Sequence, residues 1–337
     1  MKVIQIQGGY GLAHVKQVER EMPIPGPNEV LIKIRAVALN SRDLGVIAGI
    51  YQPDLSNPLV LTSDAVGEVV ALGAQASKFG VGERVSGIFT QSWIAGEASQ
   101  ANWGSTLGSP LDGMLAEYVV LPEQGLVQVP DYLTDAEAAT LPCAGVTAWH
   151  AIVEEGGVKS GDTVVVQGTG GVSLFALQFA KLQGASVIAT SSSDEKLEKA
   201  RQLGADFGIN YRAQPEWENE VLKLTGGRGA DHIVDVGGAS TLNHSISALR
   251  VGGRISIVGL LSGGSVEGFQ VVPAIVRKVR LQAINVGSRA MFEAMNRAIT
   301  QHTLHPAIDR VFSFEQAIEA FDYLQNGSYF GKICITL

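Results

Sequence analysis

Residues 168–173, Gly-Thr-Gly-Gly-Val-Ser, are the segment whose residue types and spacing point most directly to chemistry. They follow a β-branched run at 163–166. Gly168 permits a tight turn, Gly170 leaves room for a pyrophosphate, and Ser173 takes the third small position, where helix and strand pack closely. The N–H groups of a helix beginning here would face the phosphates. The predicted dinucleotide contacts are Gly168, Thr169, Gly170, Gly171 and Val172. The alternative is a plain glycine turn.

The end of the next apolar run favours NADPH over NADH. An NAD site normally has Asp or Glu about twenty residues after the glycine loop, bonded to the ribose 2′-OH. The corresponding residue here is Ser191. Hydroxyls and an ammonium could instead bind a 2′-phosphate. The predicted contacts are Ser191, Ser192, Lys196 and Tyr211. Alternatively, Ser192 and Glu195 have the spacing of a capping box and only begin a helix.

Cysteine and histidine residues form no convincing metal-binding pattern. Cys143 and Cys334 are far apart, which excludes a disulfide framework and favours a reducing cytoplasm. His302 and His305 have H-x-x-H spacing, but no cysteine is nearby, so we expect surface or turn residues. The same interpretation applies to His14, His232 and His244. His150 is expected to be packed.

The segments that position these residues change character along the chain. Before about residue 130 the pattern is β-rich, and residues 30–36 alternate apolar and charged side chains as in a half-buried strand. Residues 91–113 are small, polar and irregular, and predict an exposed lobe or loop. From about 135 to 285, short apolar runs alternate with helical stretches, which predicts a doubly wound parallel sheet. A helix over 288–302, two short elements and a last strand follow. We expect this tail to pack onto the first domain.

Composition limits the classes of partner. The 337 residues suffice for two domains, and the formal net charge of −8 argues against nucleic acid or an anionic membrane surface as the main partner. The first residues lack the apolar region of a signal peptide, and no apolar run is long enough to span a membrane. We therefore expect a cytoplasmic protein that binds a small molecule.

Motifs along almost the whole chain resemble one family. They lie at 64–85, 113–122, 138–151, 161–181, 204–212 and 329–335. Together they resemble the medium-chain dehydrogenase/reductase superfamily, and more closely its zinc-independent, quinone-oxidoreductase-like branch. The resemblance implies an α/β fold with a β-rich GroES-like catalytic domain (1–130, completed by 286–337) and a Rossmann doubly wound dinucleotide-binding domain (131–285). It also implies a homodimer through the edge of the Rossmann sheet, at residues 280–287.

The same resemblance identifies the positions that bind zinc in the metal-dependent members. Those members use Cys, His and Cys, and the matching residues here are Asn40, Ser63 and Cys143. Asn40 and Ser63 are not usual zinc ligands. Residues 91–113, which correspond to the structural-zinc lobe, contain no cysteine. We therefore predict no metal, with Cys143 as a small buried apolar residue.

Hydride transfer without zinc requires an acceptor that is already activated, such as a quinone or an α,β-unsaturated carbonyl. By resemblance, Asn40 lies beside the nicotinamide and donates a hydrogen bond, and Tyr51 donates a proton or lines the pocket. Asp43 is expected to pair with Arg42 or to cap a helix. The further cofactor contacts implied by the family are Thr147, Gly259, Leu260, Val286, Gly287 and Lys332. Pocket walls are expected from Tyr51, from residues 91–108 with Trp93 and Trp103, and from residues near 261–273.

Three functions remain open on the sequence. The leading hypothesis is an NADPH-dependent quinone or enone reductase, with NADH as the less favoured cofactor. The second is a zinc-independent alcohol dehydrogenase or carbonyl reductase, with Asn40, Tyr51 or an ordered water carrying the proton. The third is a non-catalytic NADPH-binding protein. The intact glycine loop and the segments 38–44 and 51–58 favour an enzyme.

Overall fold

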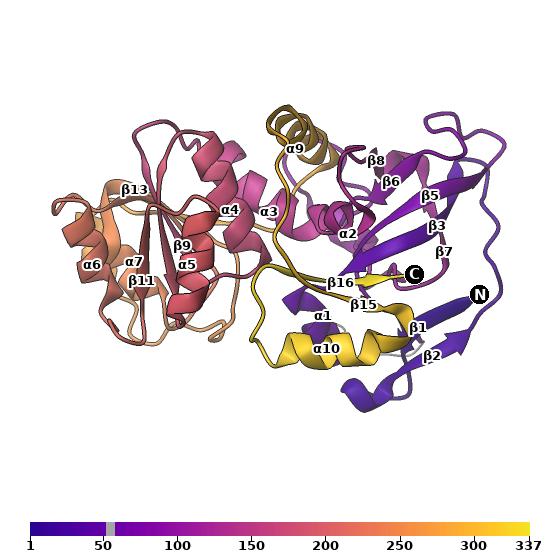
Figure 1. Ribbon diagram of the computed structural model, residues 1–337, viewed down its shortest axis with the longest axis horizontal. Coiled ribbons are helices and arrows are strands. Elements are labelled where there is room, and N and C mark those ends of the chain that lie inside the picture. Colours follow the sequence, from indigo (N-terminus) through magenta and orange to yellow (C-terminus); the bar gives the residue numbers. More distant parts are fainter. Residues whose placement is uncertain (52–57) are drawn as a thin grey trace. The chain divides into compact units, whose positions relative to one another are not determined.

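A computed structural model describes residues 1–51 and 58–337, and the chain forms two compact units (Figure 1). Unit 1 comprises Met1–Val146 and Val286–Leu337, and unit 2 comprises Thr147–Asn285. The change in sequence pattern near residue 131 comes before this boundary. Residues 131–146 go with unit 1 because helix α2 (Asp135–Ala139) packs on strands β3 (Glu29–Ala38) and β5 (Asp64–Leu72).

Unit 1 is built on a seven-stranded sheet with the order β15-β16-β3-β5-β6-β8, in which β7 also pairs with β3. A three-stranded sheet, β2-β1-β4, accompanies it. The other strands are β1 (Lys2–Ile6), β2 (Val15–Glu19), β4 (Leu59–Val60), β6 (Arg84–Gly87), β7 (Tyr118–Pro122), β8 (Leu126–Gln128), β15 (Ile308–Ser313) and β16 (Lys332–Thr336). The other helices are α1 (Ser41–Ile47), α9 (Arg289–His302) and α10 (Ala317–Gln325), and α3 (Val146–Trp149) spans the boundary.

Strand β3 is the central strand of this sheet and confirms the predicted alternation. Its residues Val30, Ile32 and Ile34 are buried, whereas Lys33 and Arg35 are half-buried. The C-terminal strand β16 pairs antiparallel with β3, with Cys334 opposite Ala38. The prediction that the tail packs onto the first domain is therefore confirmed.

Unit 2 contains the predicted parallel sheet, with strand order β11-β10-β9-β12-β13-β14. Its strands are β9 (Thr163–Gln167), β10 (Ser186–Ser191), β11 (Phe207–Asn210), β12 (Ala230–Asp235), β13 (Leu249–Ile257) and β14 (Arg280–Ala283). Its helices are α4 (Gly171–Leu182), α5 (Asp194–Gln202), α6 (Trp217–Leu224), α7 (Leu242–Ala248) and α8 (Val271–Val276). Helices α6 and α7 cover one face of this sheet and α4 and α5 the other (Figure 1), which confirms the doubly wound fold.

Two local expectations need correction. Residues 91–113 are not simply an exposed loop, because Trp93, Thr106 and Leu107 are buried and a 3₁₀-helix covers Gln100–Ser105. His232 is not a surface residue. It lies buried in β12 and its Nε2 lies 2.9 Å from Ser256 Oγ. Burial lowers the pKa of His232 to about 3, with a smaller contribution from Arg254.

Candidate active site

Three strands of unit 1 bring distant polar residues together. Strand β3 pairs antiparallel with both β5 and β16, so the end of β3 lies beside the beginnings of the other two. Asn40 follows β3, Asp64 begins β5 and Lys332 begins β16. Residues 292 positions apart in the sequence therefore make direct contact.

Lys332 and Asn40 form the centre of this polar cluster. Lys332 is only 4% exposed, and its Nζ donates to the Leu39 carbonyl oxygen at 2.5 Å and to Asn40 Oδ1 at 2.6 Å. Asn40 Nδ2 is buried and makes no hydrogen bond of normal geometry among the described residues, although it lies close enough to the Asp64 carboxylate to lower the pKa of that group. The amide therefore has an engaged acceptor end and an available donor end. The ammonium that the family resemblance assigns to the cofactor is bonded within unit 1.

Asp64 connects the cluster to Ser63 and Cys143. Its Oδ1 accepts from Ser63 Oγ at 2.7 Å, and its Oδ2 accepts from the Cys143 backbone N–H at 3.1 Å. Burial raises the pKa of Asp64, while the ammonium of Lys332, the hydroxyl of Ser63 and the nearby amide of Asn40 act in the opposite direction. The carboxyl is thus a fully buried acceptor whose partners all come from this cluster.

Cys143 differs from the expected buried apolar residue, because its side chain is only partly buried. Burial, and then the neighbouring Asp64 carboxylate, still raise the pKa of its thiol. The neutral thiol is therefore favoured at neutral pH, and a neutral thiol is a poor nucleophile.

Asp43 caps helix α1. Its Oδ2 accepts from the Asn40 backbone N–H at 2.7 Å, which decides between the two roles expected from the sequence. Burial raises the pKa of Asp43 to about 6, although the Asn40 N–H and Arg42 lower it. The cap fixes the backbone from which the Asn40 side chain extends.

Arg42 links Tyr51 to the loop that carries Ser109. Its guanidinium donates to the carbonyl oxygens of Leu107 at 3.2 Å and Ser109 at 2.7 Å, and lies 5.3 Å from the Tyr51 ring centroid. Tyr51 is 55% exposed. The rest of the predicted wall segment, residues 52–57, lies outside the described residues.

Thr62 has a strained backbone next to this cluster. Its φ is 69°, a conformation that β-branched residues rarely adopt. Its Oγ1 is buried without a hydrogen-bond partner in the described part of the chain. The neighbouring Gly113 packs so closely that an added Cβ would lie 2.1 Å from the Thr62 carbonyl oxygen. The turn that presents Ser63 is therefore held by its surroundings.

These donors do not fit a zinc ion. Asn40 Oδ1 is bonded to an ammonium and the Ser63 hydroxyl donates to Asp64, so Cys143 is the one residue of a usual zinc-ligand type among the three positions. Across residues 1–51 and 58–337, no three His, Cys, Asp or Glu side chains form a group that could hold a metal. His305, half of the H-x-x-H pair, is exposed and lies 2.7 Å from Glu137.

The glycine loop of unit 2 fits a dinucleotide phosphate. Gly168 has a φ of 73°, and helix α4 begins directly after Gly170. A Cβ added at Gly168 or Gly170 would meet no atom within 4 Å, so the space beside the backbone is open. Ser173 is buried, and its Oγ donates to the Gln167 carbonyl oxygen at 2.6 Å, which ties the helix to the preceding strand. The first N–H groups of α4 are available for an anion.

Asp235 supports this loop, a role that was not predicted from the sequence. Its Oδ2 accepts from Gln167 Nε2 at 3.1 Å and Ser245 Oγ at 2.6 Å, and its Oδ1 accepts from Gly238 N at 3.0 Å and Thr241 Oγ1 at 2.7 Å. Gln167 immediately precedes Gly168. The available signal was an aspartate at the end of a parallel strand, shortly before Gly237 and Gly238.

The predicted 2′-phosphate contacts surround the end of β10. Ser191 is its last residue and is 3% exposed, and its carbonyl oxygen accepts from the Tyr211 N–H at 3.0 Å. Ser192 is half-buried, and Tyr211 is 41% exposed. Arg212 follows Tyr211 and adds an exposed cation that is not among the predicted contacts.

The helix after β10 begins one residue later than the capping-box alternative predicts. The cap of α5 is Ser193, whose Oγ accepts from the Lys196 backbone N–H at 3.4 Å. Ser192 and Glu195 therefore do not form the cap. Glu195 pairs with Lys199 at 2.8 Å, and the Asp194 carboxylate accepts from Asn210 at 2.8 Å.

The remaining predicted cofactor contacts are distributed over both units. Thr147 is buried in α3, and Gly259 and the exposed Leu260 follow β13, all in unit 2. Val286 and Gly287 belong to unit 1. Val286 has a φ of 49°, which is unusual for a β-branched residue.

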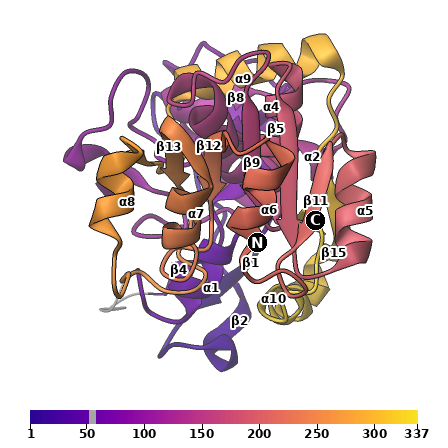
Figure 2. The same ribbon diagram turned by 90° about the vertical axis from the view of Figure 1, so that its left-hand side faces the viewer.

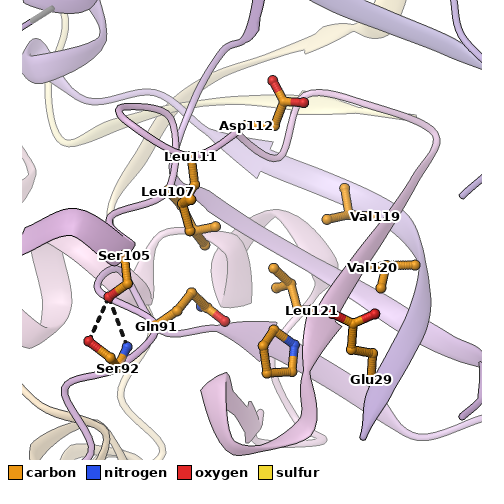
Figure 3. Close-up of a pocket in the computed structure, with 11 residues that line it drawn as sticks. Glu29, Gln91, Ser92, Ser105, Leu107, Leu111, Asp112, Val119, Val120 and Leu121 are labelled. Atoms are coloured by element: carbon orange, nitrogen blue, oxygen red, sulfur yellow. Dashed lines mark hydrogen bonds between the residues drawn. The ribbon is translucent and has the colours of Figure 1, made fainter. Parts of the chain in front are cut away.

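A cavity of about 470 Å³ lies elsewhere in unit 1 (Figure 3). Leu107, Leu111, Val119 and Leu121 supply apolar walls, and Ser92 and Ser105 are hydrogen-bonded at 2.7 Å. Its lining includes none of Asn40, Asp64 and Lys332. The candidate site therefore rests on the buried polar cluster and not on this cavity.

The two tryptophans expected in the pocket wall pack on one another. Trp93 is buried and meets Trp103 edge to face at 5.9 Å, and the Trp93 indole N–H donates to the Gly96 carbonyl oxygen at 2.8 Å. Neither lines the 470 Å³ cavity. Residues 261–273 are mostly exposed.

Comparison with known proteins gives consistent matches. Residues 26–131 match the family "Alcohol dehydrogenase GroES-like domain", and residues 171–301 match "Zinc-binding dehydrogenase". The second match contains none of the three positions Asn40, Ser63 and Cys143. No helix of the described chain has the length and apolar character needed to cross a membrane.

Individual relatives cover nearly the whole chain. A zinc-type alcohol dehydrogenase-like protein of Schizosaccharomyces pombe is 40% identical over 97% of this chain and 96% of its own. A chloroplastic quinone oxidoreductase of Triphysaria versicolor is 30% identical over 99% of this chain and 98% of its own. The crystal structure of a provisionally assigned alcohol dehydrogenase from Sinorhizobium meliloti has a TM-score of 0.92 and 43% identity, and covers 100% of this chain and 99% of its own.

Proposed function

Because the chain belongs to the medium-chain dehydrogenase/reductase superfamily, we propose that this oxidoreductase uses NADPH to reduce a quinone or an α,β-unsaturated carbonyl without zinc. The observation that carries the proposal is the Asn40 amide. Its Nδ2 is a buried donor that lies near Asp64 and makes no hydrogen bond of normal geometry among the described residues, and its Oδ1 is engaged by Lys332. A buried unpaired donor is costly, and a ligand oxygen would satisfy it.

Unit 2 supplies the proposed dinucleotide site. The open glycine loop and the N–H groups of α4 bind the pyrophosphate, and Ser191, Ser192, Lys196 and Tyr211 bind the 2′-phosphate. When bound, the nicotinamide supplies a hydride. The residues of the chain orient the cofactor and neutralise the charge of its phosphates. Asp235 keeps the glycine loop in place through its hydrogen bond with Gln167.

Unit 1 supplies the proposed group that acts on the substrate. A conjugated acceptor spreads the incoming charge onto oxygen, and Asn40 Nδ2 donates a hydrogen bond to that oxygen. The bond is strengthened because the amide is buried and its Oδ1 already accepts from an ammonium. Tyr51 is exposed and can deliver a proton through its hydroxyl or line the pocket.

Turnover assays distinguish this proposal from the two alternatives. Purified protein should oxidise NADPH with benzoquinone or an enone and leave simple alcohols untouched with NADP⁺. Oxidation of simple alcohols would instead support the zinc-independent alcohol dehydrogenase. Tight NADPH binding without turnover on any acceptor would support the non-catalytic protein.

The purified protein is expected to contain no stoichiometric zinc, because Asn40 and Ser63 are engaged in other bonds and are not zinc ligands. Elemental analysis should find well under one zinc per chain, and a chelator should leave turnover unchanged. One zinc per chain that disappears in Cys143→Ala would contradict this prediction.

We further propose that two copies associate through the edge of the unit 2 sheet. Strand β14 is the edge strand and is exposed along its whole length. Helix α8 precedes it at the edge opposite α5 (Figure 2). Four apolar residues of α8, Val271, Val272, Ile275 and Val276, are between 53% and 70% exposed. An apolar sheet edge of this kind is usually paired or covered.

Light scattering at micromolar concentration should therefore give twice the mass of the single chain. Ile275→Lys should shift the population towards monomers, because it places a charge on the apolar face of α8. Val251→Lys, at another exposed valine of unit 2, is the matched control. A monomeric wild type would refute the proposed association.

A further inference from the structure

We propose that Lys332 is a positioning residue that fixes the orientation of the Asn40 amide, so that Nδ2 is the end offered to the substrate oxygen. The inference rests on the proposed function. It concerns how the donor of the reaction is selected, and it gives Lys332 a role other than the cofactor contact implied by family resemblance.

The chemistry of the two groups permits only one orientation. A lysine ammonium has three donors and no acceptor, whereas an amide side chain has an acceptor end and a donor end. The 2.6 Å contact with Lys332 Nζ therefore requires the Asn40 oxygen. Rotating the amide by a half-turn would place two N–H groups against a buried cation. The end that is not bonded to Lys332 is therefore Nδ2.

The ammonium itself is held in place from several elements. It donates to the Leu39 carbonyl oxygen at 2.5 Å, and the Leu39 N–H donates to the Ile333 carbonyl oxygen at 2.9 Å, which fixes β16 against the residue preceding Asn40. The ammonium is buried at the first position of β16. It is therefore withdrawn from solvent, unlike the ammonium of a lysine on a surface.

The charges around Lys332 keep it in this position. The carboxyl groups of Asp64 from β5 and Asp43 from α1 lie close enough for Lys332 to lower the pKa of both. The same ammonium lowers the pKa values of the Cys143 and Cys334 thiols, against the larger effect of burial. Arg42 is the other cation that acts on Asp43. A buried cation with carboxylates beside it is expected to stay paired.

Polarisation gives the arrangement a second effect. A hydrogen bond from a charged donor to Oδ1 draws electron density toward the oxygen and makes the N–H groups of the same amide stronger donors. Lys332 therefore both selects Nδ2 and strengthens it, without contacting the substrate.

A double-mutant cycle tests this inference. Lys332→Met should lower kcat about 10-fold or more, while the dissociation constant for NADPH changes by less than about 2-fold. In the Asn40→Ala background the same change should lower kcat by less than about 3-fold, because the group through which Lys332 acts is absent. Lys332→Arg, which also has donors only, should retain most of the turnover. Thr336→Val, on the same strand, is the control that should leave kcat unchanged.

A spectroscopic readout separates this inference from the proposed function. In protein labelled with ¹⁵N-asparagine, the side-chain NH₂ signal of Asn40, identified by its loss in Asn40→Ala, should shift in Lys332→Met and not in Thr336→Val. If Lys332→Met does not fold, Lys332→Gln, which can also accept from Nδ2, should lower kcat where Lys332→Arg does not.

Three results would overturn the inference. The first is a kcat of the double variant that falls by the product of the two single losses, which would mean that the residues act independently. The second is weaker NADPH binding with unchanged kcat in Lys332→Met, and the third is an Asn40 signal that does not shift in Lys332→Met. A wild type that reduces no quinone or enone would refute the proposed function alone, since the spectrum still tests the positioning.

Discussion

Replacing Asn40 with alanine is expected to lower turnover about 10- to 100-fold, because a hydrogen bond to developing charge contributes about 1.5–3 kcal/mol. The affinity for NADPH should fall less than turnover, since the amide is proposed to act on the reacting oxygen. Steady-state kinetics with an enone and a fluorescence titration of NADPH measure the two quantities separately. Such a split identifies an interaction that matters mainly in the transition state.

Asn40→Asp provides a sharper form of the same test. The substitution retains an oxygen for the bond to Lys332 Nζ but replaces the Nδ2 donor with a second acceptor. It should therefore lose turnover as Asn40→Ala does while retaining the bond to Lys332. Asn326→Ala, on the exposed end of α10, is the control and should match the wild type. An unchanged turnover number in both Asn40 variants would assign Asn40 to packing.

Replacing Ser191 with aspartate is expected to weaken NADPH binding about 10- to 100-fold and to leave NADH binding equal or better. The substitution removes a charge-assisted hydrogen bond of about 1.5–3 kcal/mol and places a carboxylate against the 2′-phosphate. The same carboxylate can accept from the 2′-OH of NADH. Fluorescence titration of both cofactors gives the two dissociation constants directly.

Helix α5 offers a matched pair of lysines for the same measurement. Lys196→Ala should weaken the binding of NADPH alone, and this difference should shrink as salt rises. Lys199 lies less than one turn further along α5 and pairs with Glu195, so Lys199→Ala should leave both affinities unchanged. Equal binding of the two cofactors by the wild type would show that Ser191 and Ser192 only lead into a helix.

Local features were predictable from the sequence. The glycine loop was recognisable because a tight turn between a β-branched strand and a helix restricts residue types at single positions. The central strands of unit 2, such as β9, were recognisable because strands buried on both faces are continuously apolar. The observed helix cap is Ser193, one residue after the predicted Ser192, because either of two neighbouring serines can cap a helix. His232 was misplaced because its partner, Ser256, belongs to the adjacent strand β13.

The sequence by itself determined the class of fold. It also predicted the dinucleotide loop and, through the family resemblance, the positions that correspond to zinc ligands, since each of these is recognised from a short local motif. Only the tertiary structure decided how the replaced positions are used. Asn40 and Lys332 are 292 positions apart, and no local pattern relates them. They meet because β16 pairs antiparallel with β3, which places the first residue of one strand beside the last residues of the other. The residues next to Lys332 in the sequence are also compatible with a lysine exposed to solvent. Its burial, and the donor end that it leaves free on Asn40, follow from that pairing.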